Sequence, residues 1–341
     1  MGLNEKFFKS SDEEAGPLFN TVLYTGNSTA RAITGVGFEP DLVWIKKRNS
    51  ASNSSHMLFD IVRGVDKVII TNSTQAEYNG GGTGYHTSFD TDGFSITGNG
   101  FVNSSNTFVA WCFKAGGAAV PNTDGSIASQ VSANVANGFS IVKYSGGNSS
   151  GTTVGHGLSS APELIINKNT SKSSSWPVFV TGGIAMNSST FTLEGSSQYL
   201  SLNGTNNFLT YVFDSQLGGT ANSGSSSQSI ISYCFHSVAG VSKVGSYTGN
   251  GLTTNGPVID FGFEPSWIMI KSTSFTERWV IYDNKRSTSN PRSKVLTANS
   301  NATEIDTAYY NINFTATGFT VNGTAAFTNR SGETYIYYAI A

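Results

Sequence analysis

The chain has 341 residues and a formal net charge of −2, and charged and aromatic residues each make up 12% of it. The charged share is about half the usual value of roughly 25%, while the aromatic content excludes an intrinsically disordered chain. Neither nucleic-acid binding nor membrane insertion is expected, because there is no basic stripe and no apolar run near the roughly 18 residues of a membrane span.

Residues 1–17 form a predicted N-terminal arm ahead of the first recognisable strand. Phe7 and Phe8 precede the acidic run Asp12-Glu-Glu in this arm. A short apolar segment that becomes ordered on a partner is a common mode of attachment. Phe7 and Phe8 are therefore the candidate docking residues, and the alternative is a frayed chain end without a partner.

From residue 18 onward the chain carries three copies of one pattern. Each copy opens with a strand that ends in Tyr, continues with a Pro-led apolar strand, and closes with a strand of aromatic and small residues. Each Pro is followed six residues later by Lys, in the pairs Pro40 and Lys46, Pro162 and Lys168, and Pro265 and Lys271. Repeats indicate architecture before local patterns do, so we expect a residue kept in every copy to serve the fold.

Within a copy, runs rich in Val, Ile, Phe, Tyr and Thr alternate with turn-forming clusters, which predicts many short strands. In the first copy these strands are 21–24, 42–46, 56–60, 94–96 and 108–113. The 42–46 run is apolar until Lys46, which predicts a strand buried on both faces whose lysine reaches into water. The predicted fold is all-β, with three tandem antiparallel β-sandwich repeats of jelly-roll or concanavalin-like kind.

The predicted repeats cover residues 18–116, 138–240 and 241–341, hereafter the first, second and third copies. Residues 117–137 are predicted to be an extended connection between the first two, able to fold onto a neighbour. The link around residues 235–241 is short, so the second and third copies are expected to be fixed against one another.

Few residues in the chain suggest reactive chemistry. Cys112 and Cys234 occupy one position in the first two copies and Ala339 fills it in the third. This favours small buried residues with free thiols over a disulfide. The run from Asp90 to Asp92 resembles the opening of a calcium loop, but it lacks the further acidic ligands, so a turn is favoured and cation binding stays open.

Asp60 and Asp283 recur in the first and third copies, each with an Arg three residues later, which predicts an ion pair or a turn hydrogen bond. The histidines lack zinc-site spacing, and there is no hydrolase, phosphate-loop or cofactor motif. A glycosidase pair would have to converge in space, and the sequence singles out no pair of carboxylates. No catalytic, cofactor-binding or metal residue is therefore predicted.

Several motifs carry a resemblance to a known family. The clearest are Tyr24-Thr-Gly-Asn, Gly37-Phe-Glu-Pro-Asp-Leu-Val-Trp-Ile-Lys, Ser88-Phe-Asp-Thr-Asp-Gly-Phe and Val109-Ala-Trp-Cys-Phe-Lys. Together they resemble a domain repeated in virion proteins of marine tailed bacteriophages, including cyanophages. The resemblance covers nearly the whole chain and is weakest in the middle of the second copy.

The resemblance implies a lectin-like β-sandwich and a non-enzymatic structural protein exposed on the virion, assembled in the cytoplasm of the bacterial host. The expected role is a tail component, either a fibre or receptor-binding protein or an accessory protein on the hub. The alternatives are a capsid decoration protein and a carbohydrate-binding lectin or glycan-cleaving tailspike. Expected partners are other virion proteins, a host-surface glycan, and further copies of the chain, with a trimer suggested by analogy with tail fibres.

Overall fold

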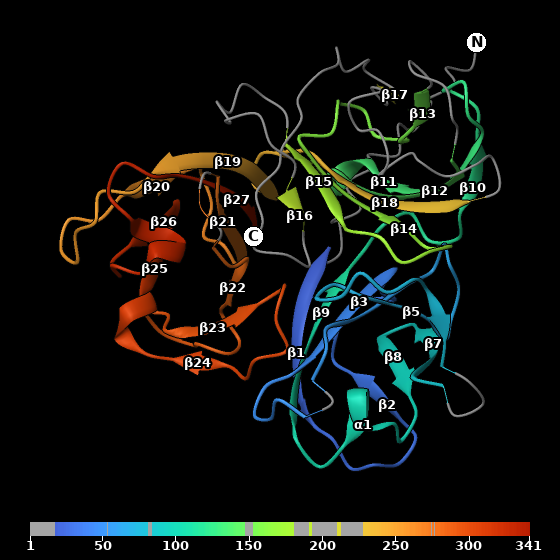
Figure 1. Ribbon diagram of the computed structural model, residues 1–341, viewed down its shortest axis with the longest axis horizontal. Helices are drawn as coiled ribbons and strands as arrows, with labels where there is room; N and C mark the ends of the chain where they lie inside the picture. Colours follow the sequence, from blue (N-terminus) through green and yellow to red (C-terminus); the bar gives the residue numbers. More distant parts are fainter. Residues whose placement is uncertain are drawn as a thin grey trace, which may run out of the picture.

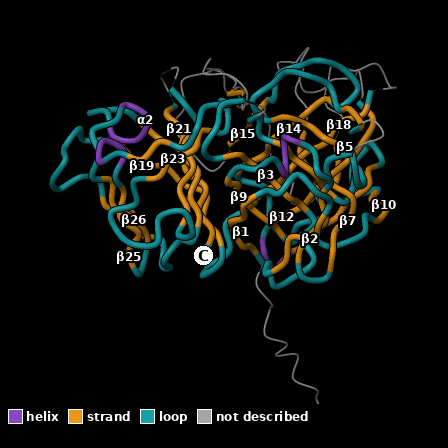
Figure 2. The backbone as a smooth tube through the Cα atoms, turned by 90° about the horizontal axis from the view of Figure 1, so that it is seen from below, coloured by secondary structure: helices purple, strands orange, loops and turns teal. Residues whose placement is uncertain are grey.

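The computed structural model describes residues 18–341 except 53, 81–83, 147–152, 181–190, 193–209, 213–227, 274 and 276. It confirms the all-β prediction: antiparallel sheets dominate the described chain (Figure 1). The helical elements of the described residues are single short turns (Figure 2), namely α1 (Gly100–Asn103), α2 (Ala326–Asn329), η1 (Val135–Asn137) and η3 (Ala308–Tyr310).

The first copy, blue to teal in Figure 1, contains a six-stranded and a three-stranded sheet. The larger sheet has the order β1 (Phe19–Thr25), β9 (Thr107–Phe113), β3 (Leu42–Lys47), β4 (Met57–Asp60), β5 (Lys67–Ile70) and β6 (Tyr78–Asn79). The smaller has the order β2 (Arg31–Thr34), β8 (Gly93–Ile96) and β7 (His86–Asp90).

The third copy repeats this topology. Its larger sheet has the order β19 (Ser242–Thr248), β27 (Thr334–Ile340), β21 (Trp267–Ser272), β22 (Val280–Asp283), β23 (Lys294–Thr297) and β24 (Ile305–Asp306). Its smaller sheet has the order β20 (Val258–Asp260), β26 (Gly318–Val321) and β25 (Ile312–Thr315). Because the strand orders match position for position, equivalent residues in the two copies can be identified from strand register.

In the second copy the larger sheet is extended by two strands from residues 117–137. Its larger sheet has the order β10 (Val120–Asn122), β11 (Ser129–Asn134), β12 (Phe139–Ser145), β18 (Ser229–Phe235), β14 (Leu164–Asn169), β15 (Pro177–Val180) and β16 (Phe191–Thr192). A separate two-stranded sheet consists of β13 (Thr153–Gly155) and β17 (Thr210–Val212). Residues 117–137, expected as an extended connection, thus contain β10 and β11, and β11 pairs along the edge of β12.

Both faces of the central strands are buried, as predicted for 42–46. Successive side chains of a strand point to opposite faces. In β3, Val43 and Ile45 enter a core that lies within the first copy, while Leu42 and Trp44 point the other way. The near-continuous apolar run therefore reflects two different cores, one on each side of the sheet.

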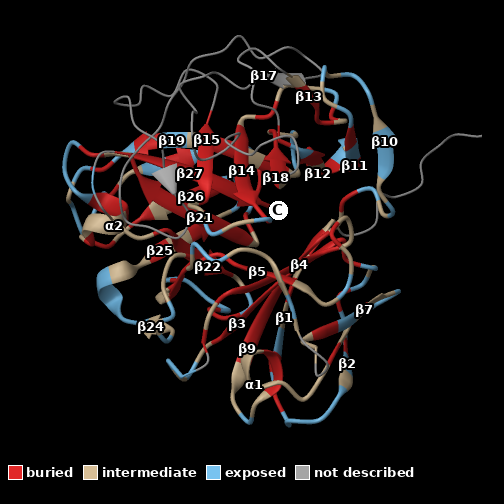
Figure 3. Ribbon diagram, turned by 45° about the vertical axis from the view of Figure 1, so that its right-hand side comes forward, coloured by how far each residue is buried: buried red, intermediate tan, exposed pale blue. Residues whose placement is uncertain are grey.

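The core on the far side is shared by all three copies. It takes nine or ten buried residues from each, including Trp111 of the first, Tyr233 of the second and Trp267 of the third. Each copy also has a smaller core of its own. Figure 3 shows the buried strands of the three copies converging on this shared core. The large sheets therefore face one another, and every copy contacts the other two.

Candidate functional site

The candidate docking residues Phe7 and Phe8 lie outside the described residues. Asp90 and Asp92, for which cation binding was left open, lie at the tight turn between β7 and β8. The Asp90 carboxylate accepts hydrogen bonds from the hydroxyls of Ser88 and Ser95, each at 2.7 Å. These contacts fit the predicted turn.

Asp92 holds a neighbouring loop in place. Its carboxylate accepts hydrogen bonds from the backbone N–H groups of Gly37 at 2.6 Å and Gly35 at 3.1 Å, and these bonds lower the pKa of Asp92. Both glycines have positive φ, 87° and 86°, a conformation that Gly adopts without a steric penalty. Asp92 thus ties the turn before β8 to the loop after β2.

Asp60, Arg63 and Tyr233 form a buried network between the first and second copies, hereafter the first–second joint. The Asp60 carboxylate pairs with Arg63 at 2.5 Å and accepts a hydrogen bond from the Tyr233 hydroxyl at 2.6 Å. Burial raises the pKa of Tyr233, and the Asp60 carboxylate raises it further, so the phenol stays protonated and donates. The predicted ion pair is confirmed, and it also binds a neighbouring copy.

The same network recurs between the first and third copies, as the first–third joint. Asp283 pairs with Arg286, and its carboxylate accepts a hydrogen bond from Trp111 Nε1 at 3.0 Å. The Arg286 guanidinium also lies over the Trp111 ring, 5.5 Å from its centroid. Strand register makes Trp111 the equivalent of Tyr233, so one copy uses its closing strand to bind the aspartate of the next.

The third joint, between the second and third copies, lacks this network. Register places Val180 where the other copies have aspartate, because Leu42, Leu164 and Trp267 pair with Asp60, Val180 and Asp283. The equivalent closing-strand residue, Tyr338, packs on Phe235 with 4.7 Å between ring centroids. Two joints are therefore ionic, whereas at the third joint this position is apolar.

The repeated lysines do not reach into water, so that prediction is wrong. Lys46, Lys168 and Lys271 are fully buried. Lys46 Nζ donates to the Ser54 carbonyl at 2.7 Å, and Lys168 Nζ donates to the Thr74 carbonyl of the first copy at 2.9 Å. Burial, together with nearby Lys47, lowers the pKa of Lys46 to about 7. Carbonyl groups therefore supply the acceptors that solvent would otherwise provide, from the same copy for Lys46 and also from the first copy for Lys168.

An ion pair joins the first and third copies nearer the surface. Arg48 binds Glu304 through two hydrogen bonds, at 2.7 and 2.9 Å, and the backbone N–H of Glu304 donates to the Arg48 carbonyl. The equivalent backbone contact between the first two copies runs from Glu77 N–H to the Thr170 carbonyl at 3.0 Å. This contact therefore recurs at two joints, and the packing of Tyr338 on Phe235 at the third joint closes the ring of copies.

The cysteines and buried histidines also belong to the framework. Cys112 and Cys234 are free and buried, as predicted, and burial raises the pKa of the Cys234 thiol to about 12. His86 stacks on Phe59, with 5.1 Å between ring centroids, and burial lowers its pKa to about 3. His56 Nδ1 accepts a hydrogen bond from Trp44 Nε1 at 2.9 Å.

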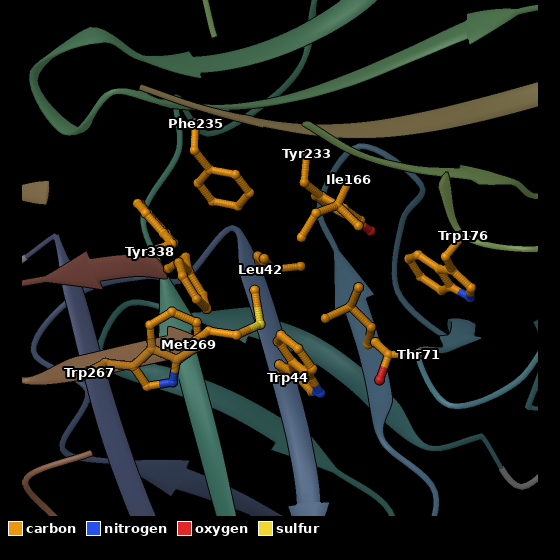
Figure 4. A pocket seen from close by; sticks show the side chains of 12 residues that line it. Leu42, Trp44, Thr71, Ile166, Trp176, Tyr233, Phe235, Trp267, Met269 and Tyr338 are labelled. Atoms are coloured by element: carbon orange, nitrogen blue, oxygen red, sulfur yellow. The ribbon is translucent and has the colours of Figure 1, made fainter. Parts of the chain in front are cut away.

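A small cavity lies in the shared core where the three copies meet. Figure 4 shows its lining side chains pointing toward one another from all three copies, with Trp44, Phe235 and Met269 among them. Its volume is about 20 Å³, far below the roughly 300–1,000 Å³ of typical ligand pockets. We therefore interpret it as a packing gap on the axis of the ring.

Within the described part of the chain, no group of three or more His, Cys, Asp or Glu side chains gathers into a metal site. None of its helices has the length and hydropathy needed to cross a membrane.

The sequence revealed the repeated residues but not their partners. Asp60 and Asp283 were recognised as recurring with their arginines, yet the bonds to Tyr233 and Trp111 join residues 173 and 172 positions apart. The one signal for these bonds was repetition. The first copy has both the aspartate and the aromatic residue of the closing strand, the second copy repeats the aromatic residue, and the third copy repeats the aspartate. Glu304 and Arg48 carried no such signal.

Comparison with known proteins gives one family. The model of a family described as a domain of unknown function (DUF7483) matches residues 14–341, which include all three copies. No curated protein and no solved structure matches the chain.

Proposed function

The chain belongs to the DUF7483 family, and we propose that it is a non-enzymatic structural protein of a tailed-bacteriophage virion, exposed on the tail. In this proposal the three copies are tandem β-sandwiches of jelly-roll or concanavalin-like kind. They form one rigid body that serves as a fibre or receptor-binding component or as an accessory protein on the hub. The virion assignment rests on the resemblance of its repeated motifs to phage structural proteins.

The observation that carries the proposal is the use of the repeated polar residues. Asp60, Asp283 and the lysines at Lys46 and Lys168 are the chain's most conspicuous buried charges, and each binds within or between copies. Buried charges are stable only when they are paired or hydrogen-bonded. Here Asp60, Asp283 and Lys168 bind across copies and fix the second and third copies against the first, which supports a mechanical role in a particle.

Residues that differ between copies remain available for recognition. The residues at equivalent positions of the three copies lie in the shared core and the joints. A receptor or a virion neighbour would therefore be bound by the loops in which the copies differ. Fold alone does not establish such a role. The alternatives are a capsid decoration protein and a lectin or glycan-cleaving tailspike.

Cryo-electron microscopy of purified particles, with mass spectrometry of their proteins, tests the proposal directly. We expect the protein in the particle, with density on the tail. Density on the head lattice would favour decoration, and absence from the particle would refute a virion role. A polysaccharide-cleavage assay on the purified protein addresses the enzymatic alternative: cleavage abolished by replacing one pair of carboxylates would overturn the non-enzymatic assignment.

A further inference from the structure

The opening strands β1, β12 and β19 are equivalent, but their outer edges are treated differently. In the second copy, β11 pairs antiparallel along β12, from Ser129 opposite Tyr144 to Asn134 opposite Phe139. In the first and third copies, β1 and β19 are terminal strands of their described sheets. The chain thus shows directly that this edge accepts an added antiparallel strand.

Side-chain burial is consistent with an uncovered edge on β1. The second and fourth residues of β12, Ser140 and Val142, are buried in the strand that β11 flanks. The equivalent residues of β1, Asn20 and Val22, are only half-buried, and Leu23 is 38% exposed. A strand on β1 would therefore bury apolar surface that the described part of the molecule leaves in contact with solvent.

The edge of β19 is closed in part by the chain itself. Ser242 exchanges backbone hydrogen bonds with Val238, and Val244 N–H donates to the Ser237 hydroxyl. A charged residue, Lys243, also lies in this strand. Natural proteins use lysine and short covering segments to keep edge strands from pairing. β1 has no charged residue, so it lacks the protection that a lysine gives.

The backbone of β1 presents donors and acceptors at alternate residues. Lys114 N–H donates to Leu18 O and Gly26 N–H donates to Asn106 O, so even-numbered residues face β9. Alternation then directs the N–H and C=O groups of Thr21, Leu23 and Thr25 away from β9. On this outer edge the Thr21 N–H donates to Asn20 Oδ1 at 2.9 Å. A carbonyl of an added strand can replace Asn20 Oδ1 as the acceptor.

This pattern is self-complementary. If two β1 strands pair antiparallel about a two-fold axis, Val22 lies opposite Val22, and Thr21 lies opposite Leu23 of the other copy. The outward backbone groups then meet in register. The Val22 pair reproduces the contact of Val131 with Val142 in the second copy, where both valines enter the interior of the sheet pair. No like charges meet in this register.

We propose that β1 is a dimerisation edge, on which β1 of a second copy of this chain pairs antiparallel about a two-fold axis at Val22. A two-fold interface requires one patch to complement itself, and strand addition to a sheet edge supplies main-chain hydrogen bonds. The two six-stranded sheets of the first copies become one continuous sheet. The proposal concerns assembly and does not depend on the virion assignment.

A cysteine at the axis tests the register in the full chain. Residues directly opposite in a non-hydrogen-bonded pair have Cα atoms about 4.5 Å apart, within disulfide range. Under mild oxidation Val22→Cys is expected to form an intermolecular disulfide. Leu23→Cys is the matched control, because its two copies lie diagonally at about 7–8 Å. Cys112 and Cys234 are buried and should not compete. Equal cross-linking of both variants would overturn the proposal.

Sedimentation of the uncross-linked protein measures the affinity. The wild type is expected to dimerise reversibly, and Leu23→Lys to raise the dimer Kd at least about tenfold, because two new like charges lie diagonally across the axis. Ser246→Lys, at the equivalent position of β19, is expected to leave the Kd unchanged. A wild type that stays monomeric at all concentrations overturns the proposal, including the case in which the chain's own residues 1–17 cover β1. An equal effect of Ser246→Lys also overturns it.

Discussion

If the first copy is cut out as residues 18–116, we expect it not to fold. Nine of its buried side chains, including Trp44 and Trp111, belong to the shared core and would be exposed in the fragment. Exposing a large apolar side chain costs about 1.5–3 kcal/mol, so the total loss is roughly 10–25 kcal/mol. A typical domain has a stability of only about 5–15 kcal/mol. The loss therefore matches or exceeds what the first copy's own core can offset.

Circular dichroism and calorimetry test this expectation. The fragment should lack near-ultraviolet signals of packed tryptophan and show no cooperative thermal transition, whereas the full chain should unfold in one transition. Refolding residues 18–137 together with 138–341 should restore the native signal, because the joints re-form between the pieces. A fragment 18–116 that is soluble and unfolds cooperatively near the melting temperature of the full chain would refute the reasoning.

Three further expectations follow from the joints and the cores. Tyr233→Phe removes a hydrogen bond to the Asp60 carboxylate and should cost about 1.5–3 kcal/mol in urea unfolding; Tyr338→Phe, beside no such carboxylate, should cost less. Lys168→Met leaves the Thr74 carbonyl without this buried donor and should cost about 1–3 kcal/mol. His86 has a pKa lowered from 6.5 to about 3, so the unfolded chain binds its proton first as pH falls. Stability should therefore decrease below pH 6.5, by up to about 5 kcal/mol near pH 3, and a pH-independent unfolding free energy across this range would contradict the assignment.

The sequence was sufficient for what depends on local pattern. The apolar run of β3 indicated a strand covered on both faces, and the shared position of Cys112 and Cys234 indicated buried thiols. Lys46 was misjudged because a lysine at a strand end ordinarily finds water, and only the folded structure shows that the Ser54 carbonyl takes the place of water. The partners of Asp60 and Asp283 were equally out of reach, since side chains more than 170 residues apart meet only after the copies have assembled.

The closed ring of joints limits how repeats of this chain can be gained or lost in evolution. In an open array each repeat touches only its neighbours in sequence, so repeats are gained or lost at modest cost. Here the third copy returns to the first through Arg48 and Glu304, and every large sheet is covered by two others. Deleting one copy would strip a face from both survivors, and a fourth would have no gap to enter. The number of copies is therefore fixed by geometry, and variation is confined to the loops and to the outer edge of β1.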